Sequence, residues 1–193
     1  YTDNTVIDSI YKILDNLNFT GGDILEPACG TGRFFGRMPN SLSKKSHLYG
    51  VEKDSLSGRI ATQLYPNANI SVTGYENTRF QNDSIDVAIS NIPFGDFSVN
   101  DRAYNNLHLK IHDYFFAKTL DKVREGGLVV FVTSTGTLDK SNSSFRQYLS
   151  ERADLLGAIR LPNTAFKSVN TKTATDIIVL QKNTQPNKNK VNW

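Results

Sequence analysis

Four consecutive residues, Asn91-Ile92-Pro93-Phe94, have the types needed to hold a planar amino group. Such a group is a poor nucleophile because its lone pair is delocalised. The side-chain carbonyl of Asn91 could accept a hydrogen bond from one amine hydrogen. The backbone carbonyl of Ile92 could accept the other, because the following Pro93 favours an extended conformation there. Phe94 offers an aromatic face for stacking. The pattern favours attack by nitrogen on a methyl group, although Asn-x-Pro also occurs in ordinary strand-to-loop turns.

An upstream segment, Glu26-Pro27-Ala28-Cys29-Gly30-Thr31-Gly32, could hold a nucleoside cofactor. Gly30 and Gly32 allow tight turns and close approach of a ligand, but a bare Gly-x-Gly is weak evidence. The glycine spacing differs from the dinucleotide fingerprint, and no Gly-Lys-Ser/Thr follows to cradle phosphate. Glu26 could face a cationic ligand, and Glu52 could accept both hydroxyls of a ribose. These acids favour a ligand with an ammonium and a sulfonium group, which indicates S-adenosyl-L-methionine.

Cys29 is the only cysteine, so the chain can form no internal disulfide. A catalytic thiol needs a nearby base and an electropositive, exposed position. Cys29 lies between Ala28 and Gly30, where a small residue packs, and we interpret it as structural. This argues against methylation of a cytosine ring carbon, which needs a cysteine nucleophile. Cysteine usage of this kind fits a reducing, cytoplasmic setting.

The motifs fall at the ends of predicted strands in a chain where strands and helices alternate. Apolar runs predict seven strands, over residues 23–26, 48–52, 70–73, 85–90, 128–133, 156–161 and 176–181. Helical periodicity predicts helices over residues 6–17, 33–37, 54–65, 109–123 and 143–152, with Gly126-Gly127 ending the fourth. This alternation indicates an α/β fold, a mostly parallel sheet with helices on both faces. Ligands of such sheets bind outside the carboxyl ends of the strands.

The composition is that of one globular domain. The chain has 193 residues, 38% of them hydrophobic, and a net charge of +3, which is compatible with nucleic acid without indicating it. No apolar run is long enough to span a bilayer and no secretory signal is found, so we expect no membrane partner. We expect a catalytic domain over residues 1–182 and a polar linker or truncated end over 183–193. The chain begins without Met, and we expect it to be a piece of a longer protein.

The two motifs, in this order, resemble the class I S-adenosylmethionine-dependent N6-adenine DNA methyltransferases of the gamma group. The similarity covers nearly the whole chain. It extends to the methylase modules of type I restriction-modification subunits and of very large phage or mobile-element proteins with helicase regions. The resemblance implies a Rossmann-like, seven-stranded sheet whose last strand is antiparallel. It also implies methyl transfer from S-adenosyl-L-methionine to the N6 amine of a flipped-out adenine in DNA.

The resemblance also implies a role for each matching residue, and it implies no metal ligand. Asn91, Ile92, Pro93 and Phe94 match the catalytic Asn-Pro-Pro-Phe/Tyr, and Phe166 falls where the family places an aromatic residue against the extruded base. The implied cofactor-binding residues are Tyr1, Thr2, Glu26, Ala28, Gly30, Gly32, Glu52 and Glu76.

Two departures from the family pattern stand out. Ile92 replaces the first proline, but the position contributes its carbonyl, so activity should survive with a less rigid loop. Nothing after Gln181 resembles a target recognition domain, which implies such a region, or a helicase region, elsewhere in the protein or in a partner subunit. Residues 95–106 predict a solvated loop, from which Arg102 could touch DNA.

Three other functions remain open at this stage. A protein methyltransferase acting on a glutamine side-chain amide would use a similar Asn-Pro-Pro-Tyr clamp, although the segment from Asp154 to Lys182 looks like restriction-type adenine methylases. Methylation of an RNA base is a further possibility that the motif alone does not exclude. A non-catalytic module could bind cofactor or DNA for a larger assembly, although Asn91 and Phe94 speak against it.

Overall fold

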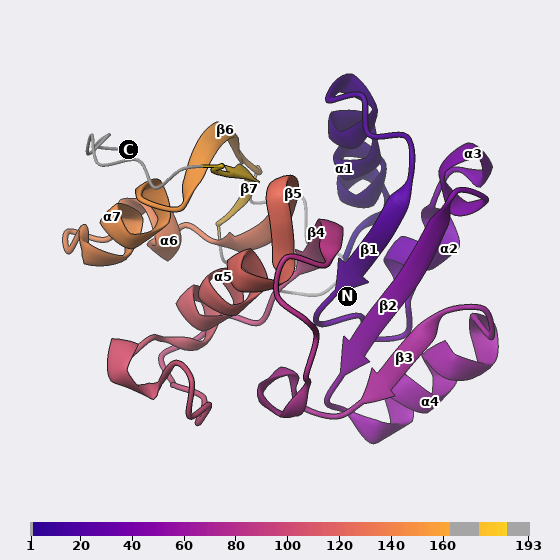
Figure 1. Ribbon diagram of the computed structural model, residues 1–193, viewed down its shortest axis with the longest axis horizontal. Coiled ribbons are helices and arrows are strands. Elements are labelled where there is room, and N and C mark those ends of the chain that lie inside the picture. Colours follow the sequence, from indigo (N-terminus) through magenta and orange to yellow (C-terminus); the bar gives the residue numbers. More distant parts are fainter. Residues whose placement is uncertain (1, 163–173, 185–193) are drawn as a thin grey trace.

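A single seven-stranded sheet runs through the protein. The computed structural model describes residues 2–162 and 174–184. The strand order is β3-β2-β1-β4-β5-β7-β6, and Figure 1 shows it as one twisted sheet. The strands are β1 (Gly22–Glu26), β2 (Ser46–Glu52), β3 (Asn69–Val72), β4 (Ile85–Asn91), β5 (Val123–Ser134), β6 (Ala153–Arg160) and β7 (Thr175–Lys182). β1 to β5 pair in parallel, whereas β7 is antiparallel to both β5 and β6. The predicted α/β class, with an antiparallel last strand, is confirmed.

Two helices follow an aspartate whose side chain caps the N-terminus. The backbone N–H of Thr5 donates to Asp3 Oδ1 (2.9 Å) at the start of α1, and that of Ser57 donates to Asp54 Oδ1 (2.8 Å) at the start of α4. The α-helices are α1 (Asn4–Asn16), α2 (Arg33–Arg37), α3 (Asn40–Ser43), α4 (Ser55–Leu64), α5 (Ile111–Lys122), α6 (Gly136–Asp139) and α7 (Ser144–Ser150). Two 3-10 turns are η1 (Tyr75–Asn77) and η2 (Asn105–Leu107).

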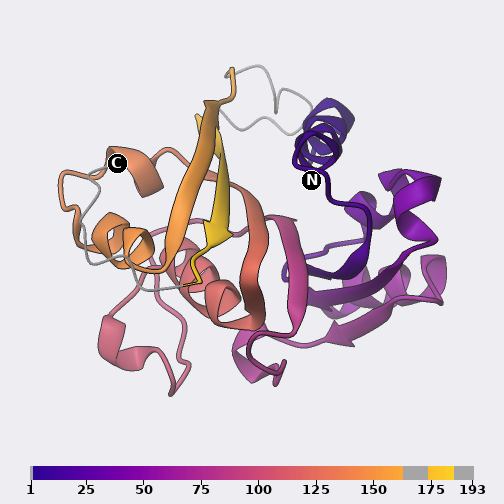
Figure 2. The same cartoon turned by 45° about the horizontal axis from the view of Figure 1, so that its top comes forward.

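The sheet separates two hydrophobic cores. Alternate residues of β5 point to opposite faces, so Val130 and Val132 pack in one core and Val129 and Phe131 in the other. The first core contains buried residues of α1, α2 and α4, and the second contains those of α5 and α7. Figure 2 shows α1 and α5 on opposite sides of the sheet. Helices on both faces explain why β4 and β5 read as almost continuous apolar runs.

The boundary between α5 and β5 differs from the prediction. The helical stripe was expected to continue to Val123 and to end at Gly126-Gly127, but α5 ends at Lys122. Val123 has an extended backbone, is fully buried and pairs with Ile85. Its β-branched side chain suits that buried strand position. Gly126, with φ of +70°, therefore lies in an irregular first part of β5.

The parallel strands bring the candidate residues to one edge of the sheet. Glu26, Glu52 and Asn91 end β1, β2 and β4, and Glu76 follows β3 in η1. Because these strands run in the same direction, their carboxyl ends share an edge. Among the described residues, no helix is long and apolar enough to cross a membrane.

Candidate functional site

The loop between β1 and α2 is tied to the end of β2 by one carboxyl group. The backbone N–H of Gly30 donates to Glu52 Oε2, and the backbone N–H of Asp54 donates to Glu52 Oε1, both at 2.7 Å. The backbone N–H of Cys29 donates to the carbonyl of Val51 at 2.9 Å. A carboxylate has about four lone-pair positions, so Glu52 can accept further hydrogen bonds from a ligand while it holds the loop.

The two glycines of this loop have different surroundings. Both have left-handed backbones, with φ of +55° at Gly30 and +81° at Gly32. A Cβ atom on Gly30 would meet nothing within 4 Å, whereas one on Gly32 would lie 2.4 Å from Cε2 of Tyr65. The ring of Tyr65 therefore covers Gly32, and the space beside Gly30 is open. That space, next to the Glu52 carboxyl group, could receive the ribose of a nucleoside.

Glu26 is a buried acid with an unsatisfied oxygen. It is 2% exposed, and its Oε2 has no hydrogen-bond partner in the described part of the chain. Burial raises the pKa of Glu26 well above its usual value, and the nearby Glu52 raises it further. A buried carboxyl group without a hydrogen-bond partner lowers the stability of the fold. A cationic ligand that pairs with Glu26 at this edge would offset that loss of stability. This chemistry fits the ammonium or sulfonium of S-adenosyl-L-methionine.

Asn91 is oriented by a residue from the start of the chain. Its Nδ2 donates to Oγ1 of the buried Thr2 at 3.1 Å. The side-chain carbonyl of Asn91 accepts no hydrogen bond from the described residues, so it can accept one from a substrate amine. Thr2, expected at the cofactor, thus contacts the tetrapeptide that is predicted to be catalytic.

The rest of the tetrapeptide continues the strand. The backbone N–H of Ile92 donates to the carbonyl of Val132 at 3.1 Å, which extends the β4–β5 ladder by one residue. The Ile92 side chain is 1% exposed and packs in the core with Ala88 and Phe131. Packing and this hydrogen bond fix the position that a proline occupies in the family pattern. Pro93 and Phe94 are half-buried at the end of the strand.

The remaining predicted residues are placed as follows. Glu76 is half-buried, with its carboxyl oxygen 3.9 Å from Nζ of Lys53, and Ala28 is half-buried in the loop. Cys29 is 4% exposed, and burial raises the pKa of its thiol, as a packing role requires. Tyr1 and Phe166 lie outside the described residues.

Sequence reasoning missed two residues near this edge. Tyr65 was expected only to end a helix, yet its ring lies against the cofactor loop and packs edge-on to Phe35, with 5.8 Å between ring centroids. Lys118 was not singled out, although its amine is buried beneath η1 and the loop that follows Phe94. A lysine within a helix ordinarily indicates a solvated face, so no local signal marks it.

Solved structures identify the class of fold. The methyltransferase subunit of a type I restriction-modification system from Streptococcus thermophilus superposes with a TM-score of 0.76 and 19% identity, over 95% of this chain and 45% of that one. The fold is that of the class I S-adenosylmethionine-dependent methyltransferases.

The family is identified from sequence. The pattern of the N-6 DNA Methylase family matches residues 1–193, and the chain belongs to that family. "Defense against restriction protein B" of Escherichia phage P1 is 30% identical over 188 residues, which are 94% of this chain and 8% of that protein. The methylase subunit of the type I restriction enzyme EcoEI of Escherichia coli is 27% identical over 195 residues, covering 87% of this chain and 39% of the subunit. The chain thus spans less than half of the length of either relative.

Proposed function

We propose that this chain transfers a methyl group from S-adenosyl-L-methionine to the N6 amine of adenine in DNA. One observation carries the proposal: Thr2 holds the amide of Asn91 so that its carbonyl is free, at the same sheet edge as the cofactor loop. Membership of the N-6 DNA Methylase family and the names of the relatives support adenine in DNA as the substrate.

Residues of three strand ends would hold the cofactor. Glu52 would accept the ribose hydroxyls, the open space at Gly30 would admit the nucleoside, and Glu26 would face the positive charge of the methionine part. Glu76 would contact the adenine ring, and Tyr1 is proposed to complete the methionine side. When bound, the cofactor supplies a methyl group on a positively charged sulfur.

The chain's own contribution to the chemistry is alignment. Asn91 Oδ1 and the carbonyl of Ile92 would each accept one hydrogen of the N6 amine, which favours a tetrahedral nitrogen whose lone pair points at the methyl group. Phe94, and on the proposal also Phe166, would stack on the extruded base. Because the developing charge lies on nitrogen, two preorganised carbonyl dipoles stabilise it in the transition state.

The organisation of the longer protein is part of the proposal. We place the catalytic domain at residues 1–182 and treat 183–193 as a polar linker or truncated end. A target recognition or helicase region, in the same protein or in a partner subunit, would select the DNA site. A cytoplasmic location remains a prediction.

The test is nucleoside mass spectrometry on unmethylated DNA after incubation with S-adenosyl-L-methionine, using the chain with its natural flanking regions. We expect N6-methyladenine with the wild type and with Asn67→Ala, an exposed asparagine outside both motifs, but none with Asn91→Ala. Cofactor affinity should be nearly unchanged in Asn91→Ala. Equal methylation by Asn91→Ala and wild type would refute the role of Asn91. Cofactor binding without methylated DNA would favour an RNA or protein substrate.

A further inference from the structure

One lysine is buried in the second core. Helix α5 is buried at each position from Ile111 to Leu120, and Lys118 among them is 3% exposed. A buried ammonium group is tolerated only with close polar partners. The partners of Lys118 are therefore informative about what this residue does.

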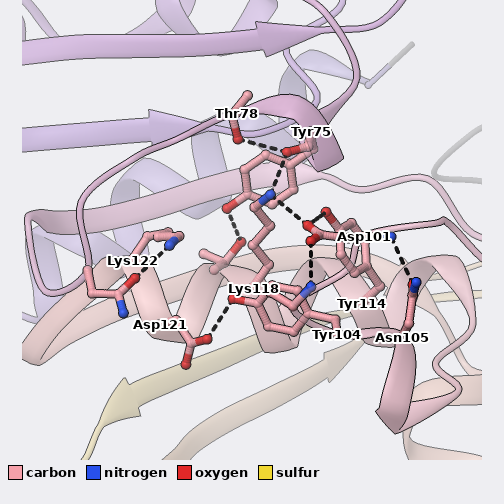
Figure 3. A network of polar contacts seen from close by, with 12 residues as sticks. Tyr75, Thr78, Asp101, Tyr104, Asn105, Tyr114, Lys118, Asp121 and Lys122 are labelled. Carbon is pink, nitrogen blue, oxygen red and sulfur yellow. Dashed lines mark hydrogen bonds and ion pairs between the residues drawn. The ribbon is translucent and has the colours of Figure 1, made fainter.

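The amine of Lys118 bridges two loops. Its Nζ donates to the backbone carbonyl of Tyr75 at 2.7 Å and to Asp101 Oδ2 at 2.9 Å, as Figure 3 shows. The same Nζ lies 4.9 Å from the centroid of the Tyr75 ring, within range of a cation–π interaction. No other hydrogen bond joins these two loops within residues 2–162 and 174–184.

Each of the two segments is continuous in sequence with predicted residues of the candidate site. Tyr75 opens η1 and directly precedes Glu76, the residue proposed to reach the adenine ring of the cofactor. Asp101 lies in the loop that directly follows the tetrapeptide ending at Phe94.

The anchor at Asp101 is strong. Besides Lys118, its carboxyl group accepts hydrogen bonds from the hydroxyl of Tyr114 at 2.8 Å and from the backbone N–H of Ala103 at 3.1 Å. Partial burial raises the pKa of Asp101, but the hydrogen bonds from Lys118 and Tyr114 outweigh it and the net shift is downward. The loop after the catalytic tetrapeptide is therefore fixed at its middle, where a solvated loop was expected.

We propose that Lys118 is a positioning residue that sets the cofactor-side turn η1 and the loop after the catalytic tetrapeptide relative to each other. The inference rests on the proposed function, because it takes Glu76 and Asn91–Phe94 as the groups being positioned. Lys118 itself touches neither substrate nor cofactor. Its loss should disturb cofactor affinity and turnover together.

Substitutions on the two sides of Lys118, one in the loop and one beside η1, should affect kcat and the Kd for cofactor to different extents. Asp101 belongs to the loop and makes no hydrogen bond to η1 in the described part of the chain, so Asp101→Asn should lower kcat more than it weakens cofactor binding. Thr78 supports only the turn, because its Oγ1 donates to the Tyr75 carbonyl at 2.7 Å. Thr78→Val should therefore raise the Kd for cofactor more than it lowers kcat. A purely structural role would not divide the two parameters in this way.

The experiment measures Kd for S-adenosyl-L-methionine by calorimetry without DNA, and kcat with saturating DNA, at a temperature where circular dichroism shows each variant folded. Lys118→Met should raise Kd and lower kcat, each by about tenfold, the effect of losing one net hydrogen bond. The matched control is Lys122→Met, one helical turn along α5, whose Nζ donates only to Asn82 Oδ1 (2.6 Å). Both parameters should stay within about twofold of wild type in that control.

Two results would overturn the inference. One is a Lys118→Met protein with wild-type Kd and kcat. The other is a set of variants in which cofactor affinity and kcat both fall only in proportion to melting temperature, with no difference in pattern between Asp101→Asn and Thr78→Val. If Lys118→Met does not fold, those two milder variants decide. If wild type methylates no DNA, the proposed function fails, and the Kd values of Lys118→Met and Thr78→Val against Lys122→Met still decide the role of Lys118.

Discussion

Alanine substitutions at Gly30 and Gly32 should separate cofactor binding from stability. Both residues have left-handed backbones, which cost a residue with a Cβ atom about 1–2 kcal/mol. For a domain of this size, each kcal/mol lowers the melting temperature by about 2–4 °C. Since a Cβ on Gly30 meets nothing within 4 Å, Gly30→Ala should lose stability only through this backbone term.

Gly32→Ala carries a second cost. Its Cβ would lie 2.4 Å from the ring of Tyr65, against an optimum of about 3.5–4.0 Å between carbon atoms. The ring must move away from its edge-on contact with Phe35, and overpacking of this kind costs about 1–3 kcal/mol. The total for Gly32→Ala is therefore about 2–5 kcal/mol. This variant should melt well below Gly30→Ala.

Cofactor affinity should be lowered by Gly30→Ala, although this is the variant with the smaller loss of stability. The methyl group of Gly30→Ala enters the open space beside Glu52, so the affinity for S-adenosyl-L-methionine should drop by at least about tenfold, or 1.4 kcal/mol. The assays are differential scanning calorimetry without ligand and titration calorimetry with it. Gly157→Ala is the matched control, because its Cβ also meets nothing within 4 Å, but in strand β6, away from the motifs and without a left-handed backbone. Wild-type affinity in Gly30→Ala would refute the placement of the cofactor at this loop.

Two further substitutions test the acids of the site. Glu52→Ala should weaken cofactor binding by about 1.5–3 kcal/mol, since a charged hydrogen-bond acceptor is lost and the N–H of Gly30 is left without its partner; unchanged affinity by calorimetry would set the ribose role aside. Glu26→Gln should be more stable than wild type at neutral pH. Burial raises the pKa of Glu26 in the folded state, so its contribution to stability is complete below the usual value of 4.5 and is lost as pH rises toward the folded pKa. Urea unfolding should therefore show the two proteins converging near pH 4 and diverging at neutral pH, while Glu26→Gln binds cofactor more weakly. A constant difference across pH would contradict the raised pKa of the buried Glu26.

The sequence predicted the central strands β4 and β5 because they are buried along most of their length. Residues 85–90 and 128–133 are mostly apolar, and such runs leave little alternative to a buried strand. The end of α5 was wrong because Val123 fits both the helical stripe and the strand. The four-residue helices α3 and α6 were not predicted, since single turns carry too few residues for a periodic signal.

The candidate site was predictable where one local motif carries it, and not where distant segments meet. The sequence marks Asn91, but not that Thr2 would lie against its amide. It marks Glu52, but not that this carboxyl group would close the Gly30 loop as well as face a ligand. Lys118 reads as a surface residue until Asp101 and Tyr75 are seen around its amine. Tertiary contacts of this kind leave no periodic or spacing signal in the chain.

The place of β7 has a consequence for how the chain reaches its native state. Among the described strands β7 is the last in chain order, yet it lies between β5 and β6 and supplies the only pairing of β6 found there. Until it emerges from the ribosome, the hydrophobic flank of β5 is an unpaired edge, and β6 has nothing to pair with. Unpaired edges of this kind invite aggregation of nascent chains. A protein that ended before Thr175 would lose all of β7, and the sheet would then divide in its interior, between β5 and β6.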